Sequence, residues 1–152
     1  MCGVSGFVDF KFSSDEVILR KMTDSLIHRG PDDSGYFLTN TAKSQIGLGH
    51  RRLSILDLTE QGHQPMVFGK LKIIFNGEVY NFKEIRADLE AEGFSFDSNS
   101  DTEVILKAFS RWGKEMVHRL NGMFAIVILD SEQGILTLIR DRAGVKPLYW
   151  YY

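Results

Sequence analysis

The sequence predicts an α+β fold built around antiparallel β-sheet. Apolar, β-branched segments at residues 45–55, 71–75, 123–130 and 135–140 are typical of strands. Residues 131–134, Ser-Glu-Gln-Gly, join the last two segments as a hairpin loop that contains glycine. Because strand segments come in hairpin-like pairs rather than alternating one-to-one with helices, a doubly wound nucleotide-binding fold is disfavoured.

The first elements are a strand and a helix. Residues 3–10 are small, aromatic and β-branched, which indicates a strand. Residues 13–16, Ser-Ser-Asp-Glu, have the spacing of a capping box, and Ile18, Met22 and Leu26 follow at helical intervals. Residues 28–35, HRGPDDSG, are polar and punctuated by glycine and proline, and we expect them to form a loop.

Two more helices are expected in the middle of the chain. Asn81 can cap a helix that runs to Glu92, with Ile85 and Leu89 turned inward and Gly93 as its stop. A second capping box, at residues 100–103, opens a helix whose apolar side consists of Ile105, Leu106 and Phe109.

Composition and charge restrict the class of protein. The 152 residues suffice for one domain over 1–152, and the contents of 43% hydrophobic and 25% charged residues are ordinary for a globular protein. A net charge of −2 gives no electrostatic case for nucleic acid or for an anionic membrane as a partner. The longest apolar run, residues 123–129, is far shorter than a membrane span of about 20 residues. A single cysteine excludes an internal disulfide, and no secretory signal is recognisable, so we expect a cytoplasmic protein.

The sequence contains no motif for a metal or a nucleotide. Neither GxxxxGK[ST] nor GxGxxG occurs, and the histidines lie too far apart for local zinc spacing: His28, His50, His63 and His118. We therefore expect no metal and no cofactor in this domain.

Cys2, the one cysteine, follows the initiator methionine and admits two interpretations. It could be a stray residue near a frayed end, since termini are usually poorly ordered. Alternatively, removal of Met1 would give Cys2 a free α-amine, whose pKa of roughly 7.7–8.0 suits a base at physiological pH. A single residue would then be both nucleophile and base.

The Asn76-Gly77 pair also admits two interpretations. Asn-Gly between apolar runs is a strong signal for a type I′ hairpin turn. However, an asparagine amide and an adjacent glycine N–H can also donate to one oxygen atom and form an oxyanion hole.

Six segments in order favour the catalytic interpretations: MCG at 1–3, HRGPDDSG at 28–35, HRRLSILDL at 50–58, FNGEVYNF at 75–82, SDTEVIL at 100–106 and RDRAGVKPLYW at 140–150. Together they resemble the N-terminal glutaminase domain of glutamine-dependent asparagine synthetases. These are class II amidotransferases, within the N-terminal nucleophile hydrolases. The resemblance covers essentially the whole chain and implies a four-layer α-β-β-α sandwich of two antiparallel sheets.

The resemblance also implies roles for individual residues. Cys2 would attack the side-chain amide of L-glutamine, and a γ-glutamyl thioester would form and be hydrolysed to glutamate with release of ammonia. The side chain of Asn76 and the backbone N–H of Gly77 would form the oxyanion hole.

By the same resemblance, a second group of residues would bind the glutamine. Arg52 would hold the α-carboxylate, a task suited to a planar fork of donors. Asp101 would hold the α-ammonium group, with Glu78 beside it, although Asp101 could instead only favour a helix N-terminus. Arg29, in the HRGPDDSG loop, is expected to shape the site near Cys2. Backbone of the segment after Arg52 would line the site: Leu53, Ser54, Ile55 and Leu56.

In that family a second domain uses ATP, with magnesium, to activate aspartate, and it receives the ammonia. No SGGxD-like pyrophosphate loop occurs in residues 1–152, so ATP and magnesium are expected only for a synthetase domain or subunit outside this sequence. Two alternatives stay open: the glutaminase half of another class II amidotransferase (amino-sugar, purine-precursor or glutamate synthesis) and a non-catalytic regulatory module. A homo-oligomer is also open.

Overall fold

A computed structural model describes residues 2–54 and 62–152 of the chain. It has seven strands among those residues, in two antiparallel sheets of order β1-β3-β2 and β4-β5-β6-β7. The elements, in chain order, are β1 (Gly3–Asp9), α1 (Glu16–Asp24), the 3₁₀ turn η1 (Ile27–Arg29), β2 (Asp33–Asn40), β3 (Gln45–Arg52), β4 (Met66–Phe68), β5 (Leu71–Val79), α2 (Phe82–Ala91), α3 (Asp101–Trp112), η3 (Gly113–His118), β6 (Gly122–Asp130) and β7 (Ile135–Arg140).

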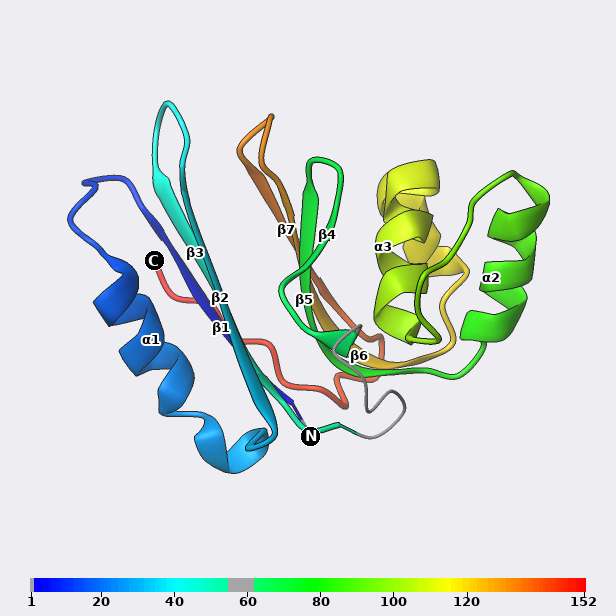
Figure 1. The fold of residues 1–152 in the computed structure, drawn as a ribbon, viewed down its shortest axis with the longest axis horizontal. Coiled ribbons are helices and arrows are strands. Elements are labelled where there is room, and N and C mark those ends of the chain that lie inside the picture. The colour runs from blue at the N-terminus through cyan, green and yellow to red at the C-terminus, as the bar shows by residue number, and fades with distance from the viewer. Residues whose placement is uncertain (1, 55–61) are drawn as a thin grey trace.

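The layers are stacked as helix, sheet, sheet and helices. Figure 1 shows α1 outside the first sheet, the two sheets face to face, and α2 with α3 outside the second sheet. This is the four-layer α-β-β-α arrangement of antiparallel sheets that the resemblance implied.

Two apolar cores hold the layers together. The larger core lies between the second sheet and α2 with α3, and it includes Ile73, Leu89 and Ile126. The smaller core lies between the sheets, where Ile46 and Leu48 of β3 meet Ile74 of β5 and Val127 and Leu129 of β6. The alternation of side chains along a strand explains this division, because Ile73 and Ile74 point to opposite faces of β5.

Strand β5 corrects the hairpin interpretation of Asn76-Gly77. The strand runs without interruption from Leu71 to Val79, and Asn76 and Gly77 pair with Ala125 and Phe124 of β6. The Asn-Gly turn signal is wrong here because pairing with β6 along the whole strand overrides a local propensity.

Helix α1 was predicted, but its start and its buried face differ from the prediction. Its N-cap is Asp15, which accepts from the Ile18 N–H. Ser13 cannot cap it, because the Ser13 N–H and side chain bond to Asp9. The buried residues of the helix are Leu19 and Thr23.

The apolar residues predicted for the buried face of this helix do not lie on it. Ile18 is 42% exposed and Met22 is 37% exposed, while Leu26 lies beyond the end of the helix.

The boundaries of two other segments needed correction. The HRGPDDSG segment is not loop throughout, since β2 begins at Asp33 and pairs with the full length of β3. The strand predicted at 45–55 ends at Arg52.

Helix α2 begins and ends within one residue of the prediction, with Ile85 and Leu89 buried and Gly93 at a φ of 94°. Asn81 does not cap it through its side chain, however. That side chain instead bridges the Arg119 carbonyl and the Asn121 N–H.

The hairpin of β6 and β7 and the strand β1 are confirmed. Helix α3 begins with Ser100 as its N-cap, as predicted, but the expected capping box is only half formed. Glu103 accepts from the backbone of Asp97 and Ser98 rather than from Ser100.

Candidate active site

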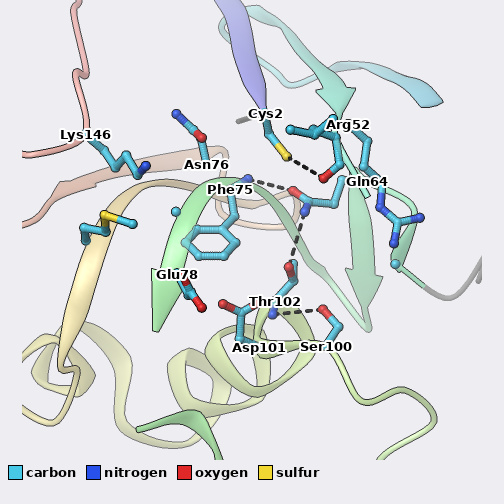
Figure 2. A pocket seen from close by; sticks show the side chains of 14 residues that line it. Cys2, Arg52, Gln64, Phe75, Asn76, Glu78, Ser100, Asp101, Thr102 and Lys146 are labelled. Atoms are coloured by element: carbon cyan, nitrogen blue, oxygen red, sulfur yellow. Dashed lines mark hydrogen bonds between the residues drawn. The ribbon is translucent and has the colours of Figure 1, made fainter. Parts of the chain in front are cut away.

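A pocket opens beside the beginning of β4, where an edge of β5 is uncovered, and Figure 2 shows the side chains that line it. Its volume of about 130 Å³ suits a molecule the size of one amino acid, since pockets for drug-sized ligands measure about 300–1,000 Å³. It is lined by Cys2, Arg52, Leu53, Gly62, Gln64, Phe75, Asn76, Gly77, Glu78, Ser100, Asp101, Thr102, Met123 and Lys146.

Strand β1 brings the nucleophile candidate into this pocket. Cys2 immediately precedes β1, an edge strand of the first sheet that is held by pairing with β3 from Gly3 to Asp9. A Cβ added to Gly3 would meet Leu26 and Arg29 beside α1, whereas the neighbouring Cys2 lines the pocket. The Cys2 Sγ lies 3.8 Å from the carbonyl oxygen of Leu53. Cys2 is therefore anchored at the pocket rather than frayed.

Strand β5 brings Asn76 and Gly77 to the same pocket from the other sheet. The side chain of Asn76 is buried on the face of β5 that carries Ile74, the face toward β1 and β3. Gly77 has no room for a side chain, because an added Cβ would lie 2.2 Å from the Met123 carbonyl oxygen. Only glycine permits β5 and β6 to pack this closely.

The backbone of β5 follows a regular pattern along its uncovered edge. The N–H of Phe75 donates to Gln64 Oε1 at 2.7 Å, and the N–H of Val79 donates to Asp101 Oδ2 at 3.1 Å. Because alternate residues of a strand direct their N–H groups to the same side, the Gly77 N–H points to this edge too. The Gly77 N–H therefore faces the pocket between the N–H groups of Phe75 and Val79, which already donate hydrogen bonds.

The segment after β3 places Arg52 and Leu53 along the pocket. Asp32 holds this segment, since its N–H donates to the Arg52 carbonyl at 3.0 Å and its Oδ2 accepts from the Ser54 N–H at 2.8 Å. Arg52 is buried, and Gly62 lies so close to its guanidinium that an added Cβ would be 2.0 Å from Nη2.

The remaining predicted residues fall in different places. Ser54 lies beside the pocket without lining it, and Arg29 lies next to Gly3, on the side of β1 that faces α1. Ile55 and Leu56 lie outside the described residues.

Two carboxyl groups lie at the far end of the pocket from Cys2 and Asn76 (Figure 2). Asp101, the first residue of α3, is buried, and Glu78 projects from β5. Burial, helped by the nearby charge of Glu78, raises the pKa of Asp101 to about 6, although the N–H bonds from Val79 and Thr102 act to lower it. Together with Arg52, which lines the same pocket, these carboxyl groups provide the opposite charges that a zwitterionic amino acid needs.

Sequence reasoning missed several of the residues that line the pocket, among them three buried polar side chains. These are Gln64, Thr102 and Lys146, each of them at most 5% exposed. Buried polar side chains have no periodic signature in a sequence, and only QP at 64–65 and VKP at 145–147 mark two of them as local features.

Among residues 2–54 and 62–152, no cluster of three or more His, Cys, Asp or Glu side chains could hold a metal ion. None of the helices in these residues is long and apolar enough to span a bilayer.

Residues 1–152 match the family described as "Glutamine amidotransferase domain". The chain belongs to this family.

Two asparagine synthetases of Bacillus subtilis (strain 168) are among its relatives. The proteins named "Asparagine synthetase [glutamine-hydrolyzing] 3" and "Asparagine synthetase [glutamine-hydrolyzing] 1" are each 40% identical to this glutamine amidotransferase domain, over 99% of the chain. The chain spans only 25% and 24% of their lengths.

The fold is also found in a solved structure. The glutamine phosphoribosylpyrophosphate amidotransferase of B. subtilis, complexed with ADP and GMP, superposes with a TM-score of 0.71. The match covers 96% of the present chain and 38% of that protein at 20% identity, which establishes the similarity of fold.

Proposed function

We propose that this domain hydrolyses the side-chain amide of L-glutamine to glutamate and ammonia, with Cys2 as nucleophile. The observation that carries the proposal is the convergence of Cys2, from one sheet, with Asn76 and Gly77, from the other, in a single pocket. A nucleophile and two oxyanion donors are the groups that amide hydrolysis through an acyl-enzyme needs.

The chemical steps follow from these groups. With Met1 removed, the α-amine of Cys2 takes the thiol proton as sulfur attacks the amide carbon. The negative oxygen of the tetrahedral intermediate accepts hydrogen bonds from the Asn76 amide and the Gly77 N–H. The carbon–nitrogen bond then breaks, ammonia leaves with the proton from the α-amine, and water hydrolyses the thioester to glutamate and the free thiol.

The rest of the pocket recognises the amino-acid end of glutamine. Arg52 binds the α-carboxylate, and Asp101 with Glu78 binds the α-ammonium group. The backbone of Leu53 lines the site with Ser54 beside it, and Arg29 shapes the region near Cys2. This hydrolysis needs neither a metal nor a cofactor in the domain.

We further propose that the ammonia is delivered to an ATP- and magnesium-dependent synthetase domain or subunit, for asparagine synthesis from aspartate in the cytoplasm. The asparagine synthetase names of the relatives support this acceptor. Another class II amidotransferase reaction, such as purine-precursor synthesis, is the alternative, because the same fold occurs in the phosphoribosylpyrophosphate enzyme.

The direct test is to incubate the purified chain with glutamine and to follow ammonia and glutamate. Equal amounts of both products are expected from the wild type, and none from Cys2→Ala. Turnover that survives in Cys2→Ala would overturn the mechanism. Supplying the two candidate acceptor systems, aspartate with an asparagine synthetase domain or the purine-precursor counterpart, distinguishes the acceptors.

A further inference from the structure

The uncovered edge of β5 is closed by side chains in the place that another strand would occupy. Strand β4 pairs with β5 only from Leu71 to Ile73, where Met66 is its last partner. At the next outward-facing residue, Phe75, the N–H donates to Gln64 Oε1 and the carbonyl accepts from His50 Nε2 at 3.1 Å. Both backbone groups of Phe75 are thus satisfied without a strand.

Gln64 is itself held from both sides of the molecule. Its Nε2 donates to Thr102 Oγ1 of α3 at 3.2 Å. Its backbone packs on Gly35 of β2 so closely that a Cβ on Gly35 would lie 1.8 Å from the Gln64 carbonyl oxygen. Gln64 therefore connects the first sheet, β5 and the start of α3, the three parts that carry the proposed site (Figure 2).

His50 supports the same peptide from β3. It is fully buried, and burial lowers its pKa to about 4, so the ring is neutral at physiological pH. Because the Phe75 carbonyl is an acceptor, Nε2 carries the proton, and the buried Nδ1 has no hydrogen-bond partner among residues 2–54 and 62–152. The bond to the Phe75 carbonyl is therefore the hydrogen bond that orients the ring among the described residues.

We propose that Gln64 and His50 are positioning residues that fix the Phe75 peptide and thereby aim the oxyanion donors of Asn76 and Gly77 at the substrate. Neither residue needs to touch the reacting atoms. This inference rests on the glutaminase function proposed above. Its energetic basis is the sensitivity of catalysis to geometry, since a misplacement of about 1 Å can cost about 100-fold in rate.

The first test removes the Gln64 amide without changing its size. For Gln64→Met we expect kcat to fall about 10- to 100-fold while KM for glutamine changes less than about threefold, because the oxyanion exists only in the transition state. Thr102→Val, which removes only the anchor of the amide, should have a smaller effect in the same direction. Wild-type kcat in folded Gln64→Met would overturn the proposal.

A matched pair at His50 separates positioning from packing. His50→Gln can keep a donor near the Phe75 carbonyl and should retain most of the activity, whereas His50→Leu should lose kcat. Ile73→Val, a shortened buried side chain on the same strand but in the core beneath the helices, is the control and should lower Tm while leaving kcat unchanged. Equal activity of the Gln and Leu variants would contradict a positioning role for His50.

Amide hydrogen exchange tests whether Gln64 holds the Phe75 N–H, and this test does not depend on glutamine hydrolysis. In Gln64→Met we expect exchange of the Phe75 N–H to become at least about tenfold faster, with little change at Ile126 of the neighbouring strand. Unchanged protection of Phe75 would overturn the inference even if the enzyme is active. If the wild type does not hydrolyse glutamine, the function fails, and the exchange result still decides whether Gln64 holds the strand.

Discussion

Asp101 is a side chain whose ionisation destabilises the folded protein, because its carboxyl group is buried. Burial raises its pKa, so the folded protein holds this proton more tightly than the unfolded chain does. The folded state consequently loses stability as the pH rises from about 4 to about 6, and ionised Asp101 is a cost above that range. The proposed function gives this loss of stability a reason, because the ionised carboxylate would bind the α-ammonium group of glutamine.

The pH dependence of glutaminase activity follows from the same shift. Only ionised Asp101 attracts an ammonium group, so kcat/KM for glutamine should rise with pH through about 6. Asp101→Asn should have a low kcat/KM and no acidic limb near pH 6, with a Tm close to that of the wild type. Wild-type kinetics with a lowered Tm would show instead that Asp101 serves only the N-terminus of α3.

Asn76 offers a test with little structural side effect. Asn76→Asp replaces a donor by an acceptor and a negative charge, and losing one oxyanion donor costs roughly 10²–10³ in kcat. We expect kcat to fall by about that factor, KM to change little and Tm to stay near normal. Asn76→Gly serves as the second variant. Wild-type turnover in Asn76→Asp would exclude an oxyanion role.

The α-amine of Cys2 can be tested by extending the chain. A Gly-Ser extension that stays ahead of Cys2 converts the amine to an amide nitrogen, which cannot take the thiol proton. Glutaminase activity should then be lost, while the same extension after Tyr152 should leave it intact. Mass spectrometry should show that the active species lacks Met1. Full activity with the amino-terminal extension would contradict the proposed base.

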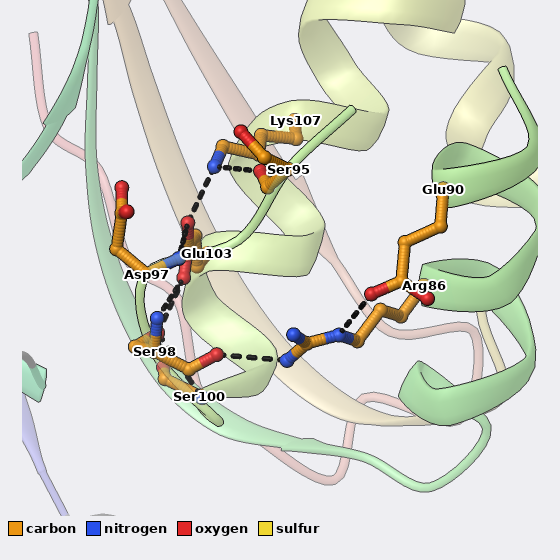
Figure 3. A network of polar contacts seen from close by, with 8 residues as sticks. All are labelled: Arg86, Glu90, Ser95, Asp97, Ser98, Ser100, Glu103 and Lys107. Atoms are coloured by element: carbon orange, nitrogen blue, oxygen red, sulfur yellow. Dashed lines mark hydrogen bonds and ion pairs between the residues drawn. The ribbon is translucent and has the colours of Figure 1, made fainter. Parts of the chain in front are cut away.

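At the scale of elements, a buried ion pair holds the segment that leads into α3 (Figure 3). Lys107 and Glu103 lie one helical turn apart, with Nζ and Oε1 2.5 Å apart, and both are nearly inaccessible to solvent. Lys107 also donates to the Ser95 carbonyl, and Glu103 accepts from the N–H groups of Asp97 and Ser98. These contacts fix the turn before Asp101.

Removing one member of this pair should be costly for folding. Burial alone would raise the pKa of Glu103, but the hydrogen bonds from Lys107, Ser98 and Asp97 outweigh it and lower the pKa. Breaking a buried pair costs about 3–5 kcal/mol because it leaves a buried charge uncompensated. Lys107→Met should lose about that much unfolding free energy in urea titrations.

The double variant Glu103→Gln, Lys107→Met is the control, and it should recover part of the loss. Equal stability of Lys107→Met and the wild type would mean that the pair does not hold this segment.

Elements with a strong periodic pattern were predictable from the sequence, and those set by distant pairing were not. The hairpin of β6 and β7 and the buried positions of α2 follow from local pattern. The Asn-Gly signal misled because β6 pairs through Asn76 and Gly77, and the start of α1 was misjudged because Asp9 engages Ser13. Gln64 was missed because its role depends on β4 beginning only at Met66, which no local pattern indicates.

For the whole molecule, the arrangement of the sheets decides where the site can form. The proposed nucleophile belongs to the sheet of β1, β2 and β3, and the oxyanion donors belong to the sheet of β4 to β7. The small core packs one sheet against the other, whereas the larger core joins the second sheet to its helices. The two cores should therefore have different effects on catalysis.

Two buried leucines, one in each core, test whether the cores affect catalysis differently. Leu48 of β3 lies in the core between the sheets, and Leu89 of α2 lies in the core beneath the helices; both are at most 1% exposed. Either Leu→Ala change should cost about 2–5 kcal/mol of unfolding free energy. When activity is measured well below both melting temperatures, Leu48→Ala should also lower kcat, because a loosened core lets the sheets shift relative to each other. Leu89→Ala should leave kcat near that of the wild type. Equal kcat values in the two variants would show that the packing between the sheets does not control the alignment of Cys2 with Asn76 and Gly77.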